Sequence, residues 1–381
     1  MEVYDPIHGN IYICETAKKI IDTIEFQGLR NIKQLGCCYY VFPGASHNRF
    51  EHSIGVYHLA KKYIDILNTN KQISEREELC ISIAALIHDL GHGPYSHLFD
   101  ELFSKEKHHE YRSYQLFKQM NSKYELGFTD KEVLFIKDII HPENITDTKK
   151  YLYQIVSNNN GIDVDRFDYI NRDIHMIGLN YGIEYERIMK HSKIENNNII
   201  YSEKVKNVIE NFFRTRFLMY QEVYNHRTVR CIEYMMKEYI TSLDKCLSIQ
   251  EIIETDNWNK FIEITDSIID YPPSLCEDIS KEILHNIKTR RIYKLAGELV
   301  VSTNELFDDI PSEVTNNIII DKVSIKYYGK EKCQFYTDRC IINKETFSNN
   351  DLFIIAVYYK QEYCQGDIPF KIFREIVKYI N

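Results

Sequence analysis

The chain has 381 residues, enough for one large domain or two moderate ones with an ample hydrophobic core. Its 47 lysines and arginines are outnumbered by 56 acidic residues, which gives a formal net charge of -9 at pH 7. This acidity argues against a broad electrostatic surface for nucleic acid, although it leaves room for a local basic pocket. The ten cysteines form no CxxC pair, and no apolar run approaches the roughly 18 residues that cross a membrane. Since the N-terminus has no signal-peptide pattern, we expect an intracellular protein, cytoplasmic or nuclear, with reduced thiols.

The N-terminal part of the chain mixes turn, helix and strand patterns. Residues 5–9 contain a proline and a glycine and are typical of an ordered turn. Apolar residues at helical spacing predict a helix over residues 16–30. Residues 36–44 are rich in tyrosine and end near a Pro-Gly pair, which favours a short strand. A helix that carries the apolar positions of residues 54–64 should follow.

The rest of the chain is organised around residues 74–97. Ser74 and Glu77 have the spacing of a capping box and predict a helix start. Residues 79–87 are apolar on nearly every side, so we expect this helix to be deeply buried. The helix should end near His88, because two glycines and a proline follow shortly after and no helix continues easily through them.

Two adjacent ionisable residues, His88 and Asp89, stand at the buried end of this predicted helix. Burying such groups is costly unless a partner stabilises them, and a metal ion is a suitable partner. A histidine hydrogen-bonded inside the core would explain His88 alone. It explains less well the crowding of Asp89, His92 and His97 into the same short stretch, so we favour a metal site.

The remaining residues are predicted to be mainly helical until the C-terminal lobe. We expect helices at residues 109–121, 130–140, 149–157, 161–177, 248–254, 258–269 and 276–288, and one long helix or two in series over 202–241. Alternating apolar residues then predict strands at 317–328, 334–342 and 352–359, followed by a helix at 369–380. The expected fold class is therefore mostly α, with a helical body over residues 1–305 and a small α+β C-terminal lobe over residues 306–381.

Four ligand-type residues come from three of the predicted helices. They are His52, His88, Asp89 and Asp165. Two imidazoles and two carboxylates suit Fe²⁺, Mn²⁺ or Zn²⁺ and are too rich in nitrogen for Ca²⁺. Nine of the 14 histidines fall within the first 109 residues, and this bias is hard to assign to packing. It leaves His92, His97 and His109 as candidate acids, bases or phosphate contacts.

The predicted helix over residues 161–177 carries polar residues at helical spacing. Asp165, Tyr169 and either Arg172 or Asp173 recur at helical spacing, which would place a metal ligand, a phenol and polar groups on one face. A solvated helix face would also explain Tyr169 and Asp173.

Three motifs carry a resemblance to a known family. They read HNRFEHS at residues 47–53, HDLGHGPYSH at 88–97 and GIDVDRFDYINRD at 161–173. Together with DPIHG at 5–9 and YYVFPGAS at 39–46, they resemble the HD-domain phosphohydrolases, and within them the animal deoxynucleoside triphosphate triphosphohydrolases that join a SAM domain to an HD domain. The resemblance implies an HD-type helical body. It extends weakly into the last lobe, and we expect the SAM domain to be absent because the chain begins at the catalytic part.

The resemblance also implies an activity and a set of site residues. The metal ligands would be His52, His88, Asp89 and Asp165, with Mg²⁺ accompanying the nucleotide. The residues beside the scissile bond would be His92, His97, Asp100 and His109. Contacts to the triphosphate and the sugar would come from Gln34, Leu35, Arg49, Arg166, Tyr169, Asp173, Arg216 and Tyr224. The implied reaction is attack of a metal-activated water on the α-phosphorus of a dNTP, which releases a deoxynucleoside and intact triphosphate and so regulates the dNTP pool.

Regulation by nucleotides is a further implication of the resemblance. Such enzymes are assembled by a guanine nucleotide and a deoxynucleotide bound between subunits, so we expect a homo-oligomer, a dimer or a tetramer, with GTP and dNTP as activators. The matching positions are Asp22, Gln27, Arg30, Arg187, Lys204, Arg290 and Lys294. Four positions depart from the family pattern: Tyr4 replaces an asparagine, Arg166 a lysine, Ser202 an arginine and Asn225 a glutamine.

Two other interpretations stay open at this point. The chain could be an HD phosphohydrolase that acts on another nucleotide or on nucleic-acid ends, although the lack of a broad basic composition argues against nucleic acid. It could also be a catalytically silent nucleotide sensor, although every matched ligand is present.

Overall fold

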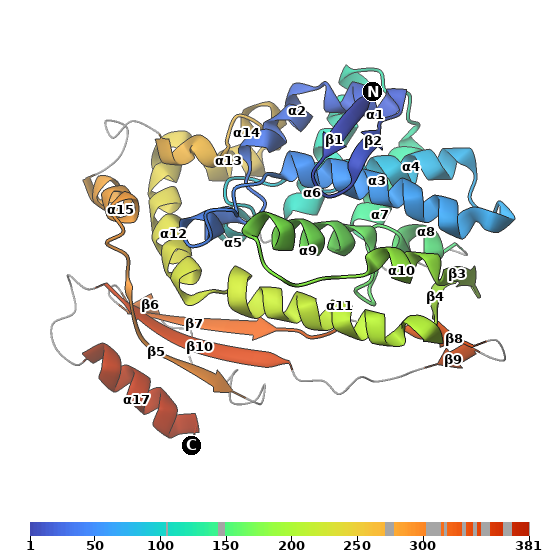
Figure 1. Ribbon diagram of the computed structural model, residues 1–381. Helices are drawn as coiled ribbons and strands as arrows, with labels where there is room; N and C mark the ends of the chain where they lie inside the picture. Colours follow the sequence, from blue (N-terminus) through green and yellow to red (C-terminus); the bar gives the residue numbers. More distant parts are fainter. Residues whose placement is uncertain are drawn as a thin grey trace. The chain divides into compact units, whose positions relative to one another are not determined.

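The structure, a computed structural model, describes residues 1–103, 106–143, 149–270, 278–301, 314–315, 318–329, 333–337, 341–343, 351–360 and 368–380. The chain, whose elements are labelled in Figure 1, divides into two compact units, and each unit is assembled from separate stretches of the sequence. The first comprises Met1–Thr215, Ser248–Ile268 and Tyr328–Phe347, and the second comprises Arg216–Leu247, Ile269–Tyr327 and Ser348–Asn381. The predicted boundary between residues 305 and 306 stays a prediction.

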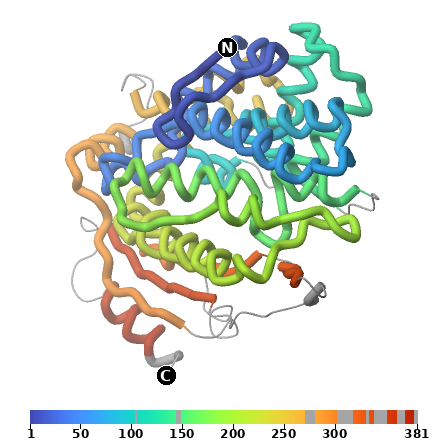
Figure 2. Tube along the Cα trace, turned by 45° about the vertical axis from the view of Figure 1, so that its right-hand side comes forward, coloured from blue at the N-terminus to red at the C-terminus, as the bar shows by residue number. Residues whose placement is uncertain are grey.

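The first unit begins with a two-stranded antiparallel hairpin. Its strands are β1 (Glu2–Asp5) and β2 (Gly9–Tyr12), and the turn expected over residues 5–9 connects them. The second strand packs against helix α3 (Arg49–Leu67), and both segments can be followed in blue in Figure 2. This contact brings the start of the chain to the helix that carries His52.

The single helix expected over residues 16–30 is divided into three pieces. They are α1 (Glu15–Ile21), α2 (Ile24–Gln27) and the 3-10 turn η1 (Gly28–Asn31). The break occurs because the hydroxyl of Thr23 accepts a hydrogen bond from the N–H of Phe26 and so caps a new helix.

The prediction of a strand over residues 36–44 is wrong. Residues Gly36–Tyr40 form a 3-10 turn, η2. Gly36 has a φ of 49°, in the left-handed region that glycine adopts readily, and a Cβ there would lie 3.0 Å from the backbone oxygen of Tyr95. The N–H of Cys38 donates to the backbone oxygen of Leu35 at 2.9 Å. This backbone hydrogen bond is therefore formed within the turn and not with a neighbouring strand.

Helix α3 packs against both α4 (Glu75–Ile87) and α9 (Val164–Ile177), and these helices form the core on which the site is built (Figure 1). The capping box expected at Ser74 and Glu77 is confirmed, and every residue from Cys80 to Ile87 is buried. The approach of α3 to α9 requires a glycine at Gly55, because a Cβ there would lie only 2.0 Å from an oxygen of Asp168.

Shorter elements complete the first unit. Its other helices are α5 (His97–Phe103), α6 (His109–Lys123), α7 (Asp130–Ile140), α8 (Tyr151–Gln154), α10 (Tyr185–Lys190), α13 (Ile249–Glu254) and α14 (Trp258–Phe261). A small sheet has the strand order β3-β4-β8-β9, formed by β3 (Ser192–Glu195), β4 (Asn198–Ser202), β8 (Gln334–Tyr336) and β9 (Ile341–Asn343). Within it β4 and β8 pair in parallel, and the other pairs are antiparallel.

Helix α11 (Lys206–Met219) leads from the first unit into the second. A π-helical turn, η5 (Tyr220–Tyr224), and helix α12 (Arg227–Leu247) follow, which confirms the alternative of two helices in series. After α15 (Asp278–Lys288) comes an antiparallel sheet in the order β5-β10-β7-β6, with β5 (Lys294–Val301), β6 (Val314–Thr315), β7 (Ile318–Ile325) and β10 (Leu352–Tyr359). Helix α17 (Ile368–Ile380) packs against β5 and β10. The predicted fold class, mostly α with a small α+β C-terminal lobe, is confirmed, although strands β1 to β5 were not predicted.

Candidate metal centre and active site

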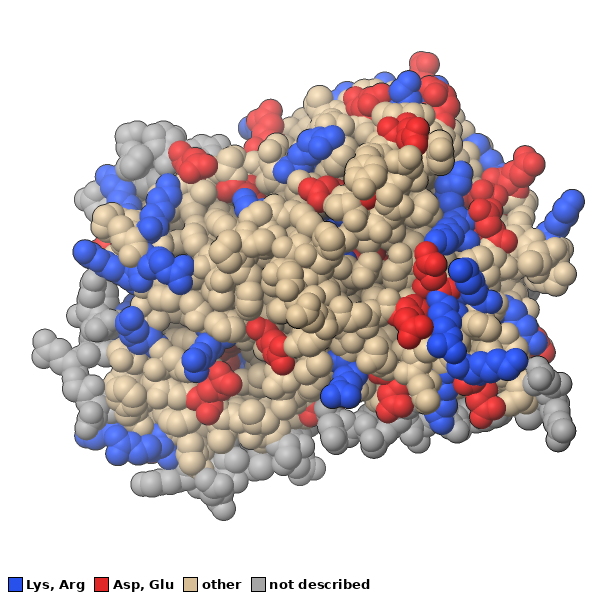
Figure 3. All heavy atoms as spheres, in the orientation of Figure 1, with Lys and Arg blue, Asp and Glu red and all other residues tan. Residues whose placement is uncertain are grey.

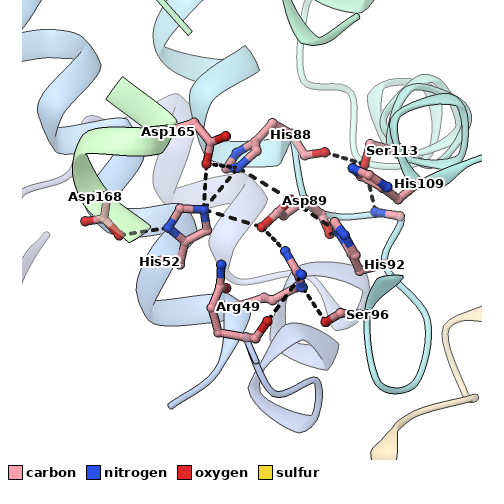
Figure 4. A network of polar contacts seen from close by, with 12 residues as sticks. Arg49, His52, His88, Asp89, His92, Ser96, His109, Ser113, Asp165 and Asp168 are labelled. Atoms are coloured by element: carbon pink, nitrogen blue, oxygen red, sulfur yellow. Dashed lines mark hydrogen bonds and ion pairs between the residues drawn. The ribbon is translucent and has the colours of Figure 1, made fainter. Parts of the chain in front are cut away.

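The four predicted metal ligands converge at one point in the first unit (Figure 4). His52 lies near the start of α3, His88 and Asp89 follow the last residue of α4, and Asp165 lies in the first turn of α9. The Nε2 atom of His52 lies 3.1 Å from Oδ1 of Asp165 and 3.2 Å from Nε2 of His88. Asp89 reaches both histidines, with each of its oxygens 3.5 Å from one Nε2 atom.

The spacing and chemistry of these donors fit a divalent transition metal ion. Ligand atoms bonded at about 2.1 Å to one ion lie roughly 3 Å from one another. The separations of 3.1, 3.2 and 3.5 Å in this cluster are of that size. Imidazole and carboxylate together are ligands that Zn²⁺, Mn²⁺ and Fe²⁺ accept. The cluster can therefore hold a divalent metal ion, with His52, His88 and Asp165 at its centre.

Both histidines are oriented through their other ring nitrogen. His52 Nδ1 donates to Oδ2 of Asp168 at 2.8 Å, and His88 Nδ1 donates to the backbone oxygen of Ala85 at 2.8 Å. Each ring therefore presents Nε2 to the centre, as metal-bound histidines do. Burial lowers the pKa of His52, but hydrogen bonds to Asp165 and Asp168 outweigh it and raise the pKa to about 10. An ion that binds here would compete with a proton for the Nε2 atom of His52.

Sequence reasoning missed the role of Asp168 as the support of this cluster. Besides His52, this fully buried carboxylate accepts hydrogen bonds from His8 Nε2 at 2.6 Å and from Arg172 Nε at 2.8 Å. Arg172 in turn donates to Oδ2 of Asp5 at 2.8 Å. Burial raises the pKa of Asp168, but the Arg172 guanidinium and the two imidazoles hold it well below its usual range. The four-residue spacing of Asp168 and Arg172 on one helix indicates an ion pair between them, but not a role beside the metal ligands.

Arg49, predicted to contact a triphosphate, is buried in the same cluster. Its guanidinium donates to Asp89, to Oγ of Ser96 at 2.8 Å and to the backbone oxygen of Gln34 at 3.4 Å. Burial raises the pKa of Asp89, but the positive charge of Arg49 is the strongest influence that holds it well below its usual range. Arg49 thus joins the residues before α3 to the turn after α4.

The second predicted group, His92, His97, Asp100 and His109, lies beside the first. The rings of His92 and His109 stack with their centroids 3.8 Å apart, and His97 meets them edge-on at 5.3 and 5.5 Å. His109 Nδ1 donates to Oδ2 of Asp100 at 2.6 Å. Asp89 connects the two groups, because its Oδ1 lies 3.2 Å from His92 Nδ1.

The imidazoles of His92 and His97 hold protons weakly. Burial, followed by the positive charges of Arg49 and His109, holds the pKa of His92 well below its usual range. Crowding by protein atoms and the same two charges lower the pKa of His97 to about 4, although its ring is open to solvent. The Nε2 atom of His92 is buried and has no hydrogen-bond partner among the described residues, so it is available to a ligand.

Arg112 fixes Asp100 and is a second residue that sequence reasoning missed. It is fully buried and donates to Asp100 and, at 2.7 Å, to the backbone oxygen of Gly91. The neighbouring hydroxyl of Ser113 donates to the backbone oxygen of His88 at 2.7 Å and accepts from the N–H of Gly91 at 2.8 Å (Figure 4). These bonds tie α6 to the turn after α4 and hold the two groups together.

The predicted contacts to sugar and phosphate are divided between the units. Those in the first unit are Gln34, Leu35, Arg49, Arg166, Tyr169 and Asp173. Gln34 is buried, and its side-chain Oε1 has no hydrogen-bond partner in the described part of the chain. Arg166 donates to Asp163, the cap of α9, and Asp173 is fully buried with its carboxylate 2.7 Å from His47. Their contacts to a substrate stay predictions.

Arg216 and Tyr224 belong to the second unit. Arg216 donates to the backbone oxygen of Lys326 at 2.9 Å, and its guanidinium lies 4.7 Å from the ring centroid of Tyr220. Tyr224 packs edge-on against the same ring at 4.9 Å. The roles of both residues in substrate binding stay predictions.

The residues predicted to bind regulatory nucleotides are mostly exposed. Asp22 lies at the end of α1, and Gln27 accepts a hydrogen bond from Arg30 Nε at 2.8 Å. The Arg30 guanidinium lies 3.5 Å from the ring centroid of Phe50 on α3. The exposed side chains farther along are Arg187 and Lys204 in the first unit and Arg290 and Lys294 in the second.

Comparison with known proteins identifies relatives along most of the chain. The family model described as HD domain matches residues 49–173, and the model described as HD associated region matches residues 183–320. A deoxynucleoside triphosphate triphosphohydrolase SAMHD1 homolog of Dictyostelium discoideum is 34% identical over 367 residues, which cover 88% of this chain and 70% of the relative. The putative HD domain-containing protein L394 of Acanthamoeba polyphaga mimivirus is 36% identical over 374 residues, with coverages of 91% and 79%.

A mammalian relative is matched over a smaller share of its own length. Deoxynucleoside triphosphate triphosphohydrolase SAMHD1 of Mus musculus is 34% identical over 410 residues, which cover 87% of this chain and 62% of the relative. The chain thus spans less than two thirds of the mouse protein. These matches confirm the resemblance to the HD-domain phosphohydrolases that the motifs indicated.

Two surface observations bear on partners. On the face drawn in Figure 3 the centre is largely uncharged, and basic side chains gather near the right and left edges, with acidic side chains among those at the right. No described helix combines the length and the apolar character that crossing a membrane requires.

Proposed function

Because the chain belongs to the HD-domain phosphohydrolase family, with relatives named SAMHD1, we propose that it hydrolyses deoxynucleoside triphosphates to a deoxynucleoside and inorganic triphosphate in a metal-dependent reaction. The observation that carries this proposal is the convergence of two oriented histidines and two carboxylates beside a group of weakly basic imidazoles. A metal-ligand set alone would fit many hydrolases. The adjacent imidazoles add groups that can exchange protons with a substrate.

His52, His88, Asp89 and Asp165 would hold the ion, which we propose to be Fe²⁺, Mn²⁺ or Zn²⁺. Bound there, such an ion supplies a water molecule of lowered pKa that can attack phosphorus at neutral pH. Asp168 keeps the His52 ring turned toward the centre while this happens. Mg²⁺ would accompany the triphosphate, since it prefers oxygen ligands.

His92 would act at the leaving 5′-oxygen. Burial and the charges of Arg49 and His109 hold its pKa well below the usual range, and negative charge arriving nearby would favour its protonated form. A nucleoside triphosphate carries about four negative charges and raises the pKa of an adjacent histidine. Protonated His92 could then donate from Nε2, the atom without a partner, as the bond between phosphorus and the 5′-oxygen breaks. His97 would orient or deprotonate a group near the α-phosphate, and Asp100 would orient His109.

Substrate binding would combine cations for the phosphates with polar contacts for the sugar. An acidic protein must concentrate cations where a polyanion binds, and arginine suits phosphate geometry. We propose Arg49, Arg166, Tyr169 and Arg216 for the triphosphate and Gln34, Leu35, Asp173 and Tyr224 for the sugar. The buried and unpaired Oε1 of Gln34 supports this assignment, because it could accept a hydrogen bond from the 3′-hydroxyl.

The test is a product analysis of the purified chain with each of the four dNTPs and Mn²⁺ or Mg²⁺. The proposal expects nucleoside and triphosphate in equal amounts. Nucleoside monophosphate with pyrophosphate, or nucleoside diphosphate with phosphate, would assign the site to a different reaction. The absence of any product with all four substrates and several metals, with and without GTP, would support a silent sensor.

We further propose that the enzyme is an intracellular homo-oligomer, a dimer or a tetramer, whose assembly GTP and dNTP favour. Asp22 offers an exposed carboxylate that could accept from a guanine base, and Arg30 contacts Phe50, two residues before His52 on α3. A nucleotide that binds the assembled state more tightly shifts the equilibrium toward it. Sedimentation and turnover measured over a GTP titration should rise together, and Asp22→Ala should weaken both responses. Full activity without GTP and no change in either quantity would refute the regulation and leave the hydrolysis standing.

A further inference from the structure

A third cluster of metal-ligand side chains lies at the start of α6, outside the groups described above. His108 precedes the first residue of α6, Glu110 lies in its first turn, and His141 follows the last residue of α7. One ligand atom from each of the three lies within 4.8 Å of the others. Glu110 stands between the imidazoles, with Oε2 at 2.6 Å from His108 Nδ1 and Oε1 at 3.9 Å from His141 Nδ1.

The second nitrogen of His141 has a carboxylate partner of its own. His141 Nε2 lies 3.1 Å from Oε1 of Glu143. A proton held there fixes the tautomer and leaves the lone pair of Nδ1 directed toward Glu110. Carboxylates orient metal-bound histidines in this way.

In the described part of the chain no lysine or arginine forms an ion pair with Glu110, although the charge of the buried Arg112 guanidinium reaches it. The ion pairs of Glu110 there are with His108, His109 and His141. The nearby Lys107 directs its ammonium elsewhere, to the backbone oxygen of Glu254 at 2.9 Å and to the Asp256 carboxylate at 2.7 Å. The Lys107 ammonium therefore does not occupy the space between the imidazoles of His108 and His141.

The cluster is accessible to an ion from solvent. The exposed fractions of the side chains are 35% for His108, 26% for Glu110 and 37% for His141. Three protein ligands with access to water resemble the open zinc sites that keep one position for a solvent molecule. Two nitrogens among three ligands disfavour Ca²⁺ and Mg²⁺ and favour Zn²⁺, Ni²⁺ or Cu²⁺.

We propose that His108, Glu110 and His141 form a second binding site for a divalent transition metal ion of the Zn²⁺ class. It is separate from the cluster around His52 and does not depend on the proposed hydrolysis. The neighbouring His109 does not compete strongly for Glu110, because its Nδ1 is bonded to Asp100 at 2.6 Å and lies 3.4 Å from Glu110.

The test is a calorimetric Zn²⁺ titration of the full chain after its metals are removed with a chelator. The background is His88→Ala with Asp89→Ala, which disables the central cluster. Adding His108→Gln and His141→Gln should remove one bound equivalent or weaken its binding by more than about 100-fold, since loss of ligands costs more than loss of their supporting partners. Adding His175→Gln, an exposed histidine in the last turn of α9, should change neither stoichiometry nor affinity.

A second variant guards against an effect of misfolding. Glu110→Gln keeps the shape of the side chain and should also weaken binding, with an unchanged circular dichroism spectrum. Identical Zn²⁺ isotherms for the double-glutamine variant and the His175→Gln control would overturn the proposal. So would zinc binding that Glu110→Gln leaves unaltered.

Discussion

The central metal cluster and the residues matched to nucleotide regulation differ in how far the folded chain itself accounts for them. In the cluster, Asp168 is fully buried and has three basic partners, and Arg49 is buried against Asp89. In the regulatory set, Asp22 is exposed, and Arg187 pairs loosely with Glu184 of its own helical turn at 3.6 Å. Buried charge must be stabilised by the fold, whereas exposed charge costs little. The contacts within this chain therefore account for the first group of residues, whereas the proposed role of the second group depends on a ligand or another subunit.

The largest effect should come from breaking the cluster at the end of α4. His88→Ala with Asp89→Ala removes two of the four donors and should reduce both bound metal and dNTP hydrolysis to background, because the remaining pair cannot hold the ion. Elemental analysis of the dialysed protein and product chromatography measure the two quantities. His175→Ala, on the exposed end of α9, is the control. Undiminished turnover in the double variant would exclude these residues as ligands.

A smaller loss should follow when only the support of the cluster is removed. Asp168→Asn keeps the size of the side chain but loses the charge that orients His52 and pairs with Arg172, and should weaken metal affinity by about 10-fold to 100-fold. Asp65→Asn, on the exposed face of the same α3 that carries His52, should leave affinity unchanged. Equal metal affinities for the two variants, measured by competition with a chelator, would show that Asp168 has no such role.

Discrimination between sugars tests the contacts proposed for the 2′ and 3′ positions. If Leu35 and Tyr224 crowd the 2′ position, kcat/KM for dATP should exceed that for ATP by at least about 100-fold. A site packed against the 2′ hydrogen leaves a 2′-hydroxyl with a steric clash and without a hydrogen-bond partner. Gln34→Ala should lower kcat/KM for dATP, since it removes the buried oxygen proposed to bind the 3′-hydroxyl. Comparable kcat/KM values for dATP and ATP in the wild type would contradict this part of the proposal.

The smallest effect concerns acid stability near the cluster. His58 lies beside His8, a donor to Asp168, with ring centroids 5.3 Å apart. Burial, then the charges of His8 and Lys62, lower the pKa of His58 to about 4. In the unfolded chain this histidine has a pKa of about 6.5, so it becomes protonated at a higher pH than in the folded chain. Its contribution to the free energy of unfolding is therefore complete above pH 6.5 and is lost as the pH falls toward 4.

The measurement is urea unfolding of the metal-free protein at pH 7 and at pH 5. His58→Gln should reduce the difference in the free energy of unfolding between the two pH values. His175→Gln serves as the matched control, because this histidine is exposed. An unchanged difference in the His58 variant would mean that its ionisation is not linked to folding.

The sequence predicted those parts of the fold whose causes are local. The capping box at Ser74 and Glu77 and the buried run that follows needed only neighbouring residues, and both are confirmed. The break at Thr23 depends on a single cap, which the continuous apolar spacing around it concealed. The turn at Gly36 depends on a positive φ and on the close backbone of Tyr95, neither of which a strand-like composition reveals.

The same division applies to the candidate site. Residues with chemistry of their own, such as His52 and Asp165, could be selected from their type and motif, and the structure brings them together. Asp168 and Arg112 could not, because their importance comes from distant partners, His8 in one case and Gly91 in the other. Supporting residues of this kind become visible only when the folded chain places those partners beside them.

The proposed attack of a metal-activated water on the α-phosphorus is tested most directly by hydrolysis of a dNTP in ¹⁸O-labelled water. Cleavage between phosphorus and the 5′-oxygen places one ¹⁸O atom in the inorganic triphosphate and none in the deoxynucleoside, and mass spectrometry of the two products reads this distribution. We expect the label in triphosphate alone, in the wild type and in Asp65→Asn. Label in the 5′-hydroxyl of the nucleoside would show attack at carbon, and label in released monophosphate would show attack at the γ-phosphorus. Either result would contradict the reaction proposed for this cluster.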